Sequence, residues 1–175
     1  MRDTLFETEV LDLTVCCRSN DVVWGAYGAN AVHFSFLQEY LAGRMGVGVG
    51  TMYQLSNNFH GYVSELERLG ESRRLFEEGI DPYENMAPCD VGRSWDRWDE
   101  DLNLFMGWHD LQWRRPSTFH PTFANDWFTH TAIHVTEANR LWRSGSMSHA
   151  MGHARDIGSP DWRAACVAWL ERRVK

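Results

Sequence analysis

The chain has 175 residues, of which 43% are hydrophobic and 23% are charged. This composition is typical of a globular protein with a buried core and excludes an intrinsically disordered chain. Acidic residues outnumber basic residues, 24 to 17, which excludes a uniformly basic surface for nucleic acid. No stretch approaches the roughly 20 apolar residues of a membrane span, and the acidic N-terminal segment is unlike a signal peptide. We expect no nucleic-acid or membrane partner, and the absence of a CxxC pair favours a cytoplasmic location.

The first half of the chain predicts strands and helices in alternation. Residues 4–18 alternate apolar with polar side chains, which indicates a strand or hairpin. Glycines and an asparagine in residues 20–30 predict a turn-rich loop. Residues 31–43 are apolar around most of the helical circumference, so we expect a helix buried in the core. Residues 47–56 predict a strand, and residues 62–69 predict a short amphipathic helix.

The second half is less regular at first and then helical. Residues 93–113 fit either one more helix or a strand. Helical spacing predicts three helices over residues 126–143, 147–157 and 159–173, the last with Ser159 as its N-cap. We therefore predict an α+β fold in which a mixed sheet packs on the long apolar helix and helices follow at the C-terminus.

The polar residues between positions 18 and 62 suggest a binding site. Arg18 and Ser19 stand at a predicted strand end, where a guanidinium and a hydroxyl can hold a phosphate. Asn30 stands at the start of the apolar helix, and its carboxamide offers one donor and one acceptor, which suits N3–H and O4 of uracil. His60 and Tyr62 are two residues apart on a strand, so they project to one side and suit a sugar hydroxyl.

This pattern resembles the thymidylate synthase and pyrimidine nucleotide hydroxymethylase family over about residues 5–70. Arg18-Ser19-Asn20-Asp21 stands where the family carries Arg-Ser-x-Asp. A glycine loop then leads to Asn30 at the start of a buried helix, although GAYGA is one residue longer than the usual loop. The sequence Asn58-Phe59-His60-Gly61-Tyr62 matches the family's His-x-Tyr. The resemblance implies a single thymidylate synthase-like domain over 1–175, with a core at 1–70, a variable region at 71–121 and C-terminal helices at 122–175.

The resemblance also implies a reaction. The expected substrate is a pyrimidine nucleoside monophosphate, and 5,10-methylenetetrahydrofolate would supply a one-carbon unit for C5, as a methyl or a hydroxymethyl group. Arg18 and Ser19 would bind the phosphate, and His60 and Tyr62 would hold the sugar. Asn30 favours uracil, because family members with aspartate there prefer cytosine. The resemblance further implies a homodimer, and it assigns the folate to these three residues: Asp21, Trp24 and Gly25.

The family's cysteine nucleophile is expected upstream of Met1, which leaves no catalytic residue in this chain. Cys89, in an Ala-Pro-Cys sequence, is a weaker substitute because it follows the binding residues instead of preceding them. Cys16 and Cys17 are interpreted as inert thiols. The alternatives are a nucleotide-binding remnant without turnover and one half of a split enzyme.

Two patterns in the second half offer rival functions. Histidines four apart in a helix share a face, so the pairs His130/His134 and His149/His153 suggest a metal site on two helices. No HExxH motif or third carboxylate ligand accompanies them, so we expect no metal. The tryptophans of residues 95–113 could stack on single-stranded nucleic acid, but the acidic residues between them favour packing inside the protein.

Overall fold

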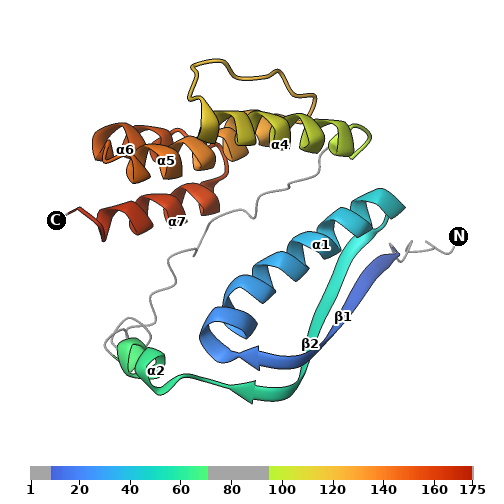
Figure 1. Ribbon diagram of the computed structural model, residues 1–175. Helices are drawn as coiled ribbons and strands as arrows, with labels where there is room; N and C mark the ends of the chain where they lie inside the picture. Colours follow the sequence, from blue (N-terminus) through green and yellow to red (C-terminus); the bar gives the residue numbers. More distant parts are fainter. Residues whose placement is uncertain (1–8, 71–94, 175) are drawn as a thin grey trace, which may run out of the picture. The chain divides into compact units, whose positions relative to one another are not determined.

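The computed structural model describes residues 9–70 and 95–174. The chain divides into two compact units, Met1–Ile80 and Asp81–Lys175, and each is described here by itself (Figure 1). The predicted single domain over 1–175 stays a prediction, and residues 71–94, with Cys89, lie outside the described residues.

The first unit is built around two parallel strands joined by a helical crossover (Figure 1). Parallel strands require such a crossover, because the chain must return to the same edge before the second strand begins. The elements in chain order are β1 (Val10–Asp21), the π-helical segment η1 (Val22–Ala29), α1 (Asn30–Met45), β2 (Gly48–His60) and α2 (Val63–Gly70). The predicted strands and helices are therefore present, and both strands end later than predicted, at Asp21 instead of residue 18 and at His60 instead of residue 56.

The register of the two strands changes near the start of the sheet. Val10 and Leu11 pair with Gly48 and Val49, and from Leu13 onward each partner lies one residue further along β2. The carboxylate of Asp12 accepts a hydrogen bond from the backbone N–H of Thr51 at 2.7 Å at this irregularity. A β-carbon at Gly50 would overlap the Asp12 side chain, so only glycine fits this position.

Helix α1 forms where the sequence predicted it, but it is not buried all round. Gln38 and Ala42 are buried, whereas Val32 and Leu37 are 55% and 42% exposed. The sheet of the described residues has two strands and not a mixed set, so it covers only one side of the helix. Gln38 links the covered side of α1 to β1, since its Nε2 donates a hydrogen bond to the carbonyl of Leu11 at 2.7 Å. The expectations of a fully buried helix and a mixed sheet were wrong for the described part of the chain.

The predicted loop at residues 20–30 is mostly helical. Asp21 ends β1, and its Oδ1 accepts hydrogen bonds from the backbone N–H groups of Val23 and Trp24 at 3.0 and 2.6 Å. A carboxylate that caps free N–H groups in this way begins a helix. The segment breaks only at Gly28, with φ −117° and ψ −123°, before α1 starts. The composition indicated a loop because composition alone does not reveal the capping hydrogen bonds that Asp21 accepts.

The second unit is helical in its described residues (Figure 1). The segment that fitted a helix or a strand forms α4 (Trp98–Arg114). The three predicted C-terminal helices are confirmed, the first beginning with a π-helical turn; they are η2 (Phe128–Ala132) with α5 (Ile133–Arg143), α6 (Met147–Arg155) and α7 (Pro160–Glu171). Ser159 precedes α7 as predicted, but its hydroxyl bonds to that of Thr131 at 2.7 Å instead of capping the helix.

The core of the second unit contains a group of aromatic side chains. Trp98 and Phe128 are almost fully buried, and their ring centroids lie 4.7 Å apart. Trp108 is buried as well, and its indole N–H donates to the carbonyl of Phe119 at 2.9 Å. Trp98 and Trp108 therefore serve packing, as expected, and not as an exposed stacking platform. None of the helices in the described residues has the length and apolarity that a membrane crossing needs.

Candidate functional site

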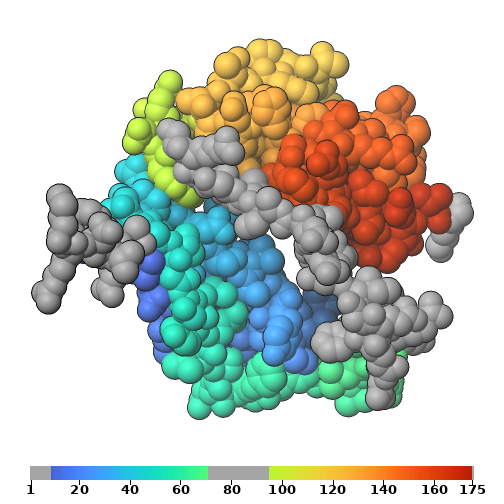
Figure 2. Space-filling model, turned by 180° about the vertical axis from the view of Figure 1, so that it is seen from behind, coloured from blue at the N-terminus to red at the C-terminus, as the bar shows by residue number. Residues whose placement is uncertain are grey.

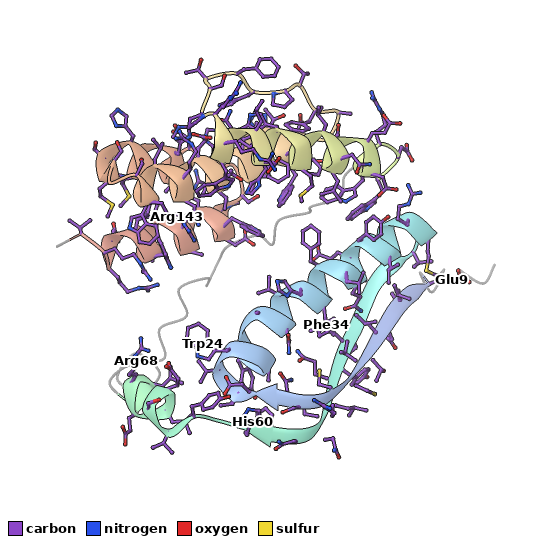
Figure 3. All side chains as sticks on the ribbon, viewed as in Figure 1. Glu9, Trp24, Phe34, His60, Arg68 and Arg143 are labelled. Atoms are coloured by element: carbon purple, nitrogen blue, oxygen red, sulfur yellow. The ribbon has the colours of Figure 1, made fainter. Side chains whose placement is uncertain are left out.

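The candidate site lies at the carboxyl ends of β1 and β2. Because the strands are parallel, their carboxyl ends meet at one edge of the sheet, and Asp21 stands opposite His60 in the register. The labelled Trp24 and His60 lie at this end of the first unit, whereas Glu9 lies at the other end of the sheet (Figure 3). The crossover thus brings together residues that are about forty positions apart in the sequence.

Ser19, His60 and Tyr62 are neighbours at this edge. The hydroxyl of Ser19 lies 3.5 Å from Nδ1 of His60. The rings of His60 and Tyr62 meet edge to face, with centroids 5.7 Å apart and an interplanar angle of 88°. Tyr62 follows the end of β2 and is exposed, so its phenol is accessible to a ligand. These three predicted residues form one polar group.

Arg18 is exposed and makes no hydrogen bond or ion pair with the described residues. Arg18 and Asp21 therefore form no ion pair with each other. One oxygen of Asp21 caps η1, and the other, Oδ2, is buried without a hydrogen-bond partner among the described residues. An unsatisfied buried carboxylate oxygen is costly, so Oδ2 can accept a donor from a ligand.

The remaining predicted residues surround Asn20. Asn30 donates from Nδ2 to Oδ1 of Asn20 at 2.9 Å. Gly25 is buried beside both, because a β-carbon there would overlap Asn20 Oδ1 and come within 3.3 Å of Asn30 Nδ2. Trp24 is 61% exposed and presents its indole to solvent. Asn30 and Gly25 are therefore joined to the site through Asn20.

Asn20 is the residue that the sequence reasoning missed. Its side chain is 2% exposed, and its Nδ2 donates to Oε1 of Gln54 at 3.3 Å and to Oγ of Ser56 at 3.2 Å. The motif Arg-Ser-x-Asp treats position 20 as variable, so it drew no attention. The available signal was in β2, where Gln54 and Ser56 follow Met52 at every second position and place polar groups on a face that should be apolar.

The histidine pairs of the second unit combine differently from the prediction. His134 of α5 and His153 of α6 lie with their Nδ1 atoms 3.2 Å apart. His149 instead lies 2.9 Å from the hydroxyl of Ser146, and the carbonyl of His130 accepts from Gly158. Residues 9–70 and 95–174 contain no cluster of three or more potential metal ligands, so the metal-binding alternative has no support there.

The shared environment lowers the pKa of both contacting histidines. Burial between the helices is the main cause for His134, and the neighbouring His153 adds to it. Burial is also the main cause for His153, and the carboxylate of Glu137 partly opposes it. The pair therefore favours the neutral form, in which one Nδ1 donates and the other accepts.

Comparison with known proteins shows which proteins this chain is similar to. The chain is 32% identical over 176 residues to the deoxyuridylate hydroxymethyltransferase of Pseudomonas phage M6, a match that covers 93% of this chain and 48% of that protein. It is also 46% identical over 55 residues to the deoxyuridylate hydroxymethyltransferase of Bacillus phage SP01, covering 31% of this chain and 14% of that protein. The chain thus spans about half the length of the first of these relatives. No family model and no solved structure matches.

These matches confirm the class of protein that the strand-end residues indicated, the thymidylate synthase and pyrimidine nucleotide hydroxymethylase family. Within that family, the relatives found are phage deoxyuridylate hydroxymethyltransferases.

Proposed function

We propose that the protein containing this chain transfers a hydroxymethyl unit to C5 of a pyrimidine nucleoside monophosphate, with dUMP as the preferred substrate. The identity of 32% across 93% of the chain to a deoxyuridylate hydroxymethyltransferase carries this proposal. The sequence did not decide between methyl and hydroxymethyl transfer, and the names of both relatives favour hydroxymethyl transfer.

The nucleotide is assigned to the edge where the two strands end. Arg18 has no partner among the described residues, so its guanidinium is available to a phosphate, and Ser19 adds a hydroxyl beside it. His60 and Tyr62 are in contact with each other and offer an imidazole and a phenol to the sugar. Asn30 pairs with the base through its carboxamide.

Methylenetetrahydrofolate supplies the one-carbon unit when it is bound. Two observations fit a pterin at this site. Oδ2 of Asp21 is a buried acceptor without a partner among the described residues, which suits a ring N–H donor. Trp24 is exposed beside it and can pack on a flat ring, whereas Gly25 is packed against Asn20 and serves the spacing of the site.

The reaction needs a thiolate that adds to C6 of the pyrimidine and makes C5 nucleophilic. We assign this thiolate to none of the cysteines in the described residues. Cys16 is exposed on β1, among residues that do not face α1. Burial raises the pKa of the Cys166 thiol, which makes it a poor nucleophile. Intact-mass analysis after incubation with 5-fluoro-dUMP and the folate tests the assignment; an adduct on Cys89 would restore that residue as the nucleophile.

Dimerisation is a further part of the proposal. Strand β2 lies at the surface of the first unit (Figure 2), and its face away from α1 carries the exposed apolar side chains of Tyr53 and Leu55. We assign a second copy of the chain to this face, because the family joins its subunits through their sheets. Sedimentation equilibrium should give a dimer, and Leu55→Glu should give a monomer. A wild-type monomer would contradict this part of the proposal.

Calorimetric titration with dUMP tests the nucleotide site. Arg18→Ala should weaken dUMP binding by about tenfold or more, because a hydrogen bond to a charged group contributes roughly 1.5–3 kcal/mol. Arg68→Ala is the matched control, since Arg68 lies on α2 and pairs with Glu65 at 3.1 Å. Deoxyuridine, which lacks the phosphate, should bind both variants equally. Unchanged dUMP affinity in Arg18→Ala would remove Arg18 from the site.

Release of tritium from C5-labelled dUMP separates an enzyme from a nucleotide-binding remnant. The exchange requires attack at C6 and loss of the C5 hydrogen, which binding alone does not cause. A protein that binds dUMP without tritium release in the presence of the folate would favour the remnant.

A further inference from the structure

Three side-chain amides form a directed chain that ends at Asn30. Gln54 donates from Nε2 to the carbonyl oxygen of Ala26 at 3.4 Å. Asn20 donates from Nδ2 to Oε1 of Gln54 at 3.3 Å, and Asn30 donates from Nδ2 to Oδ1 of Asn20 at 2.9 Å. Every amide in the series therefore gives its N–H towards Ala26 and offers its oxygen to the next residue.

The backbone carbonyl at the start of the series fixes its direction. A carbonyl oxygen can only accept a hydrogen bond, so Gln54 has to turn its NH2 group towards Ala26. The oxygen of Gln54 then faces Asn20, which has to present its own NH2 group there. Ser56 supports this orientation, because its hydroxyl accepts from the same Nδ2 at 3.2 Å. Asn20 consequently turns its oxygen towards Asn30.

Burial makes a reversed amide costly. Asn20 is 2% exposed, and Gly25, which is also buried, packs against its Oδ1. If Asn30 turned over, its oxygen would face the oxygen of Asn20, and two acceptors would be left without a donor. Because an unsatisfied buried polar group is costly, the amides are held in one orientation.

The fixed orientation determines what Asn30 offers to a base. One hydrogen of its Nδ2 is used by Asn20, which leaves the other hydrogen as a donor and Oδ1 as an acceptor. This pair complements uracil, in which N3–H donates and O4 accepts. Cytosine has the opposite pattern, since its N3 accepts and its N4 amino group donates.

We infer that the amide series from Ala26 through Gln54 and Asn20 is a specificity device that holds Asn30 in the orientation that selects uracil. Asn20 and Gln54 are positioning residues, since they act on the base only through Asn30. The inference rests on the proposed function, because it requires that Asn30 contacts the pyrimidine.

Affinities for dUMP and dCMP, measured by calorimetry on the full chain, test this inference. The wild type should favour dUMP by roughly ten- to hundredfold, the discrimination expected of one bidentate contact. Gln54→Met keeps the size of the side chain but removes both hydrogen bonds, and it should lower the preference by about tenfold. Gln54→Glu is the matched variant; its carboxylate still accepts from Asn20 and preserves the orientation, so the preference should remain.

The ratio of the affinities for dUMP and dCMP distinguishes a positioning role from general structural damage. General damage would weaken the binding of both nucleotides together and leave the ratio unchanged. If Gln54→Met does not fold, Asn20→Leu against Asn20→Asp gives the same comparison, because aspartate still accepts from Asn30. A preference that survives both Gln54→Met and Asn20→Leu would overturn the device while the proposed function stands. A wild type that binds neither nucleotide would overturn the proposed function and the device together.

Discussion

Each of the two units of the chain buries a different kind of side chain in its interior. Among the described residues of the first unit, the buried side chains include the polar Asn20 and Gln38, and Ala42 is the one buried hydrophobic residue. The second unit instead buries a group of large apolar side chains, among them Trp98, Phe128 and Ile133. Hydrophobic burial is the main source of folding stability, whereas buried hydrogen bonds specify orientation. Substitutions should therefore affect stability most in the second unit and ligand selection most in the first.

The largest expected effect is on the aromatic core. Phe128→Ala removes a ring that contacts Trp98 and Phe123, and it should lower the free energy of unfolding by about 3–5 kcal/mol. Urea denaturation followed by tryptophan fluorescence measures this, since every tryptophan except Trp24 lies in the second unit. Phe119→Ala is the control, because Phe119 is 65% exposed, and a change within about 0.5 kcal/mol is expected. Equal losses in both variants would contradict a localised core.

The same glycine substitution should have opposite effects in the two units. Gly25→Ala places a β-carbon against Asn20, so the amides must shift at a cost of about 1–3 kcal/mol, and dUMP binding should weaken. Gly107→Ala in α4 meets no atom within 4 Å and should stabilise the helix by roughly 0.5–1 kcal/mol. Thermal melting and dUMP titration of both variants measure the difference. A Gly25→Ala protein that binds dUMP normally would show that the amides tolerate displacement.

Asn30→Asp should change both selection and stability, because the carboxylate no longer donates a hydrogen bond to Oδ1 of the buried Asn20. A carboxylate loses the donor for O4 of uracil and gains an acceptor for the cytosine amino group, so the preference should shift towards dCMP by about tenfold, or ~1.4 kcal/mol. Competitive binding of the two nucleotides measures the shift. An unchanged preference would argue against contact between Asn30 and the base.

The smallest expected effect is a pH dependence in the second unit. The pKa values of His134 and His153 are lowered in the folded state, so near and below the ordinary value of 6.5 the unfolded chain binds more protons. Stability should therefore fall as the pH drops below about 6.5 and level off below the folded pKa values. Urea midpoints between about pH 8 and pH 5 measure this, and His134→Gln/His153→Gln should flatten the curve. An unaltered slope in that variant would assign the effect to other groups.

Local patterns predicted most elements, because they depend on neighbouring residues. Periodicity located α1, both strands and the C-terminal helices. It did not locate η1, which depends on one carboxylate of Asp21, or the exposure of α1, which depends on how many strands lie beneath it. The resemblance identified the strand-end residues of the candidate site. The sequence did not predict a role for Asn20, because that role depends on Gln54 and Ser56, which lie 34 and 36 residues away.

The register change near Asp12 also determines the strand pairing at the opposite end of the sheet. Without it, the partner of Asp21 would be Phe59, and the imidazole of His60 would stand one step beyond the carboxylate. A single additional residue in β2, accommodated by Gly50 at the other end of the sheet, thus sets the alignment of the edge that carries the candidate site. Lengthening or shortening the turn before β2 would leave that alignment intact, whereas deleting Gly50 would displace every side chain downstream.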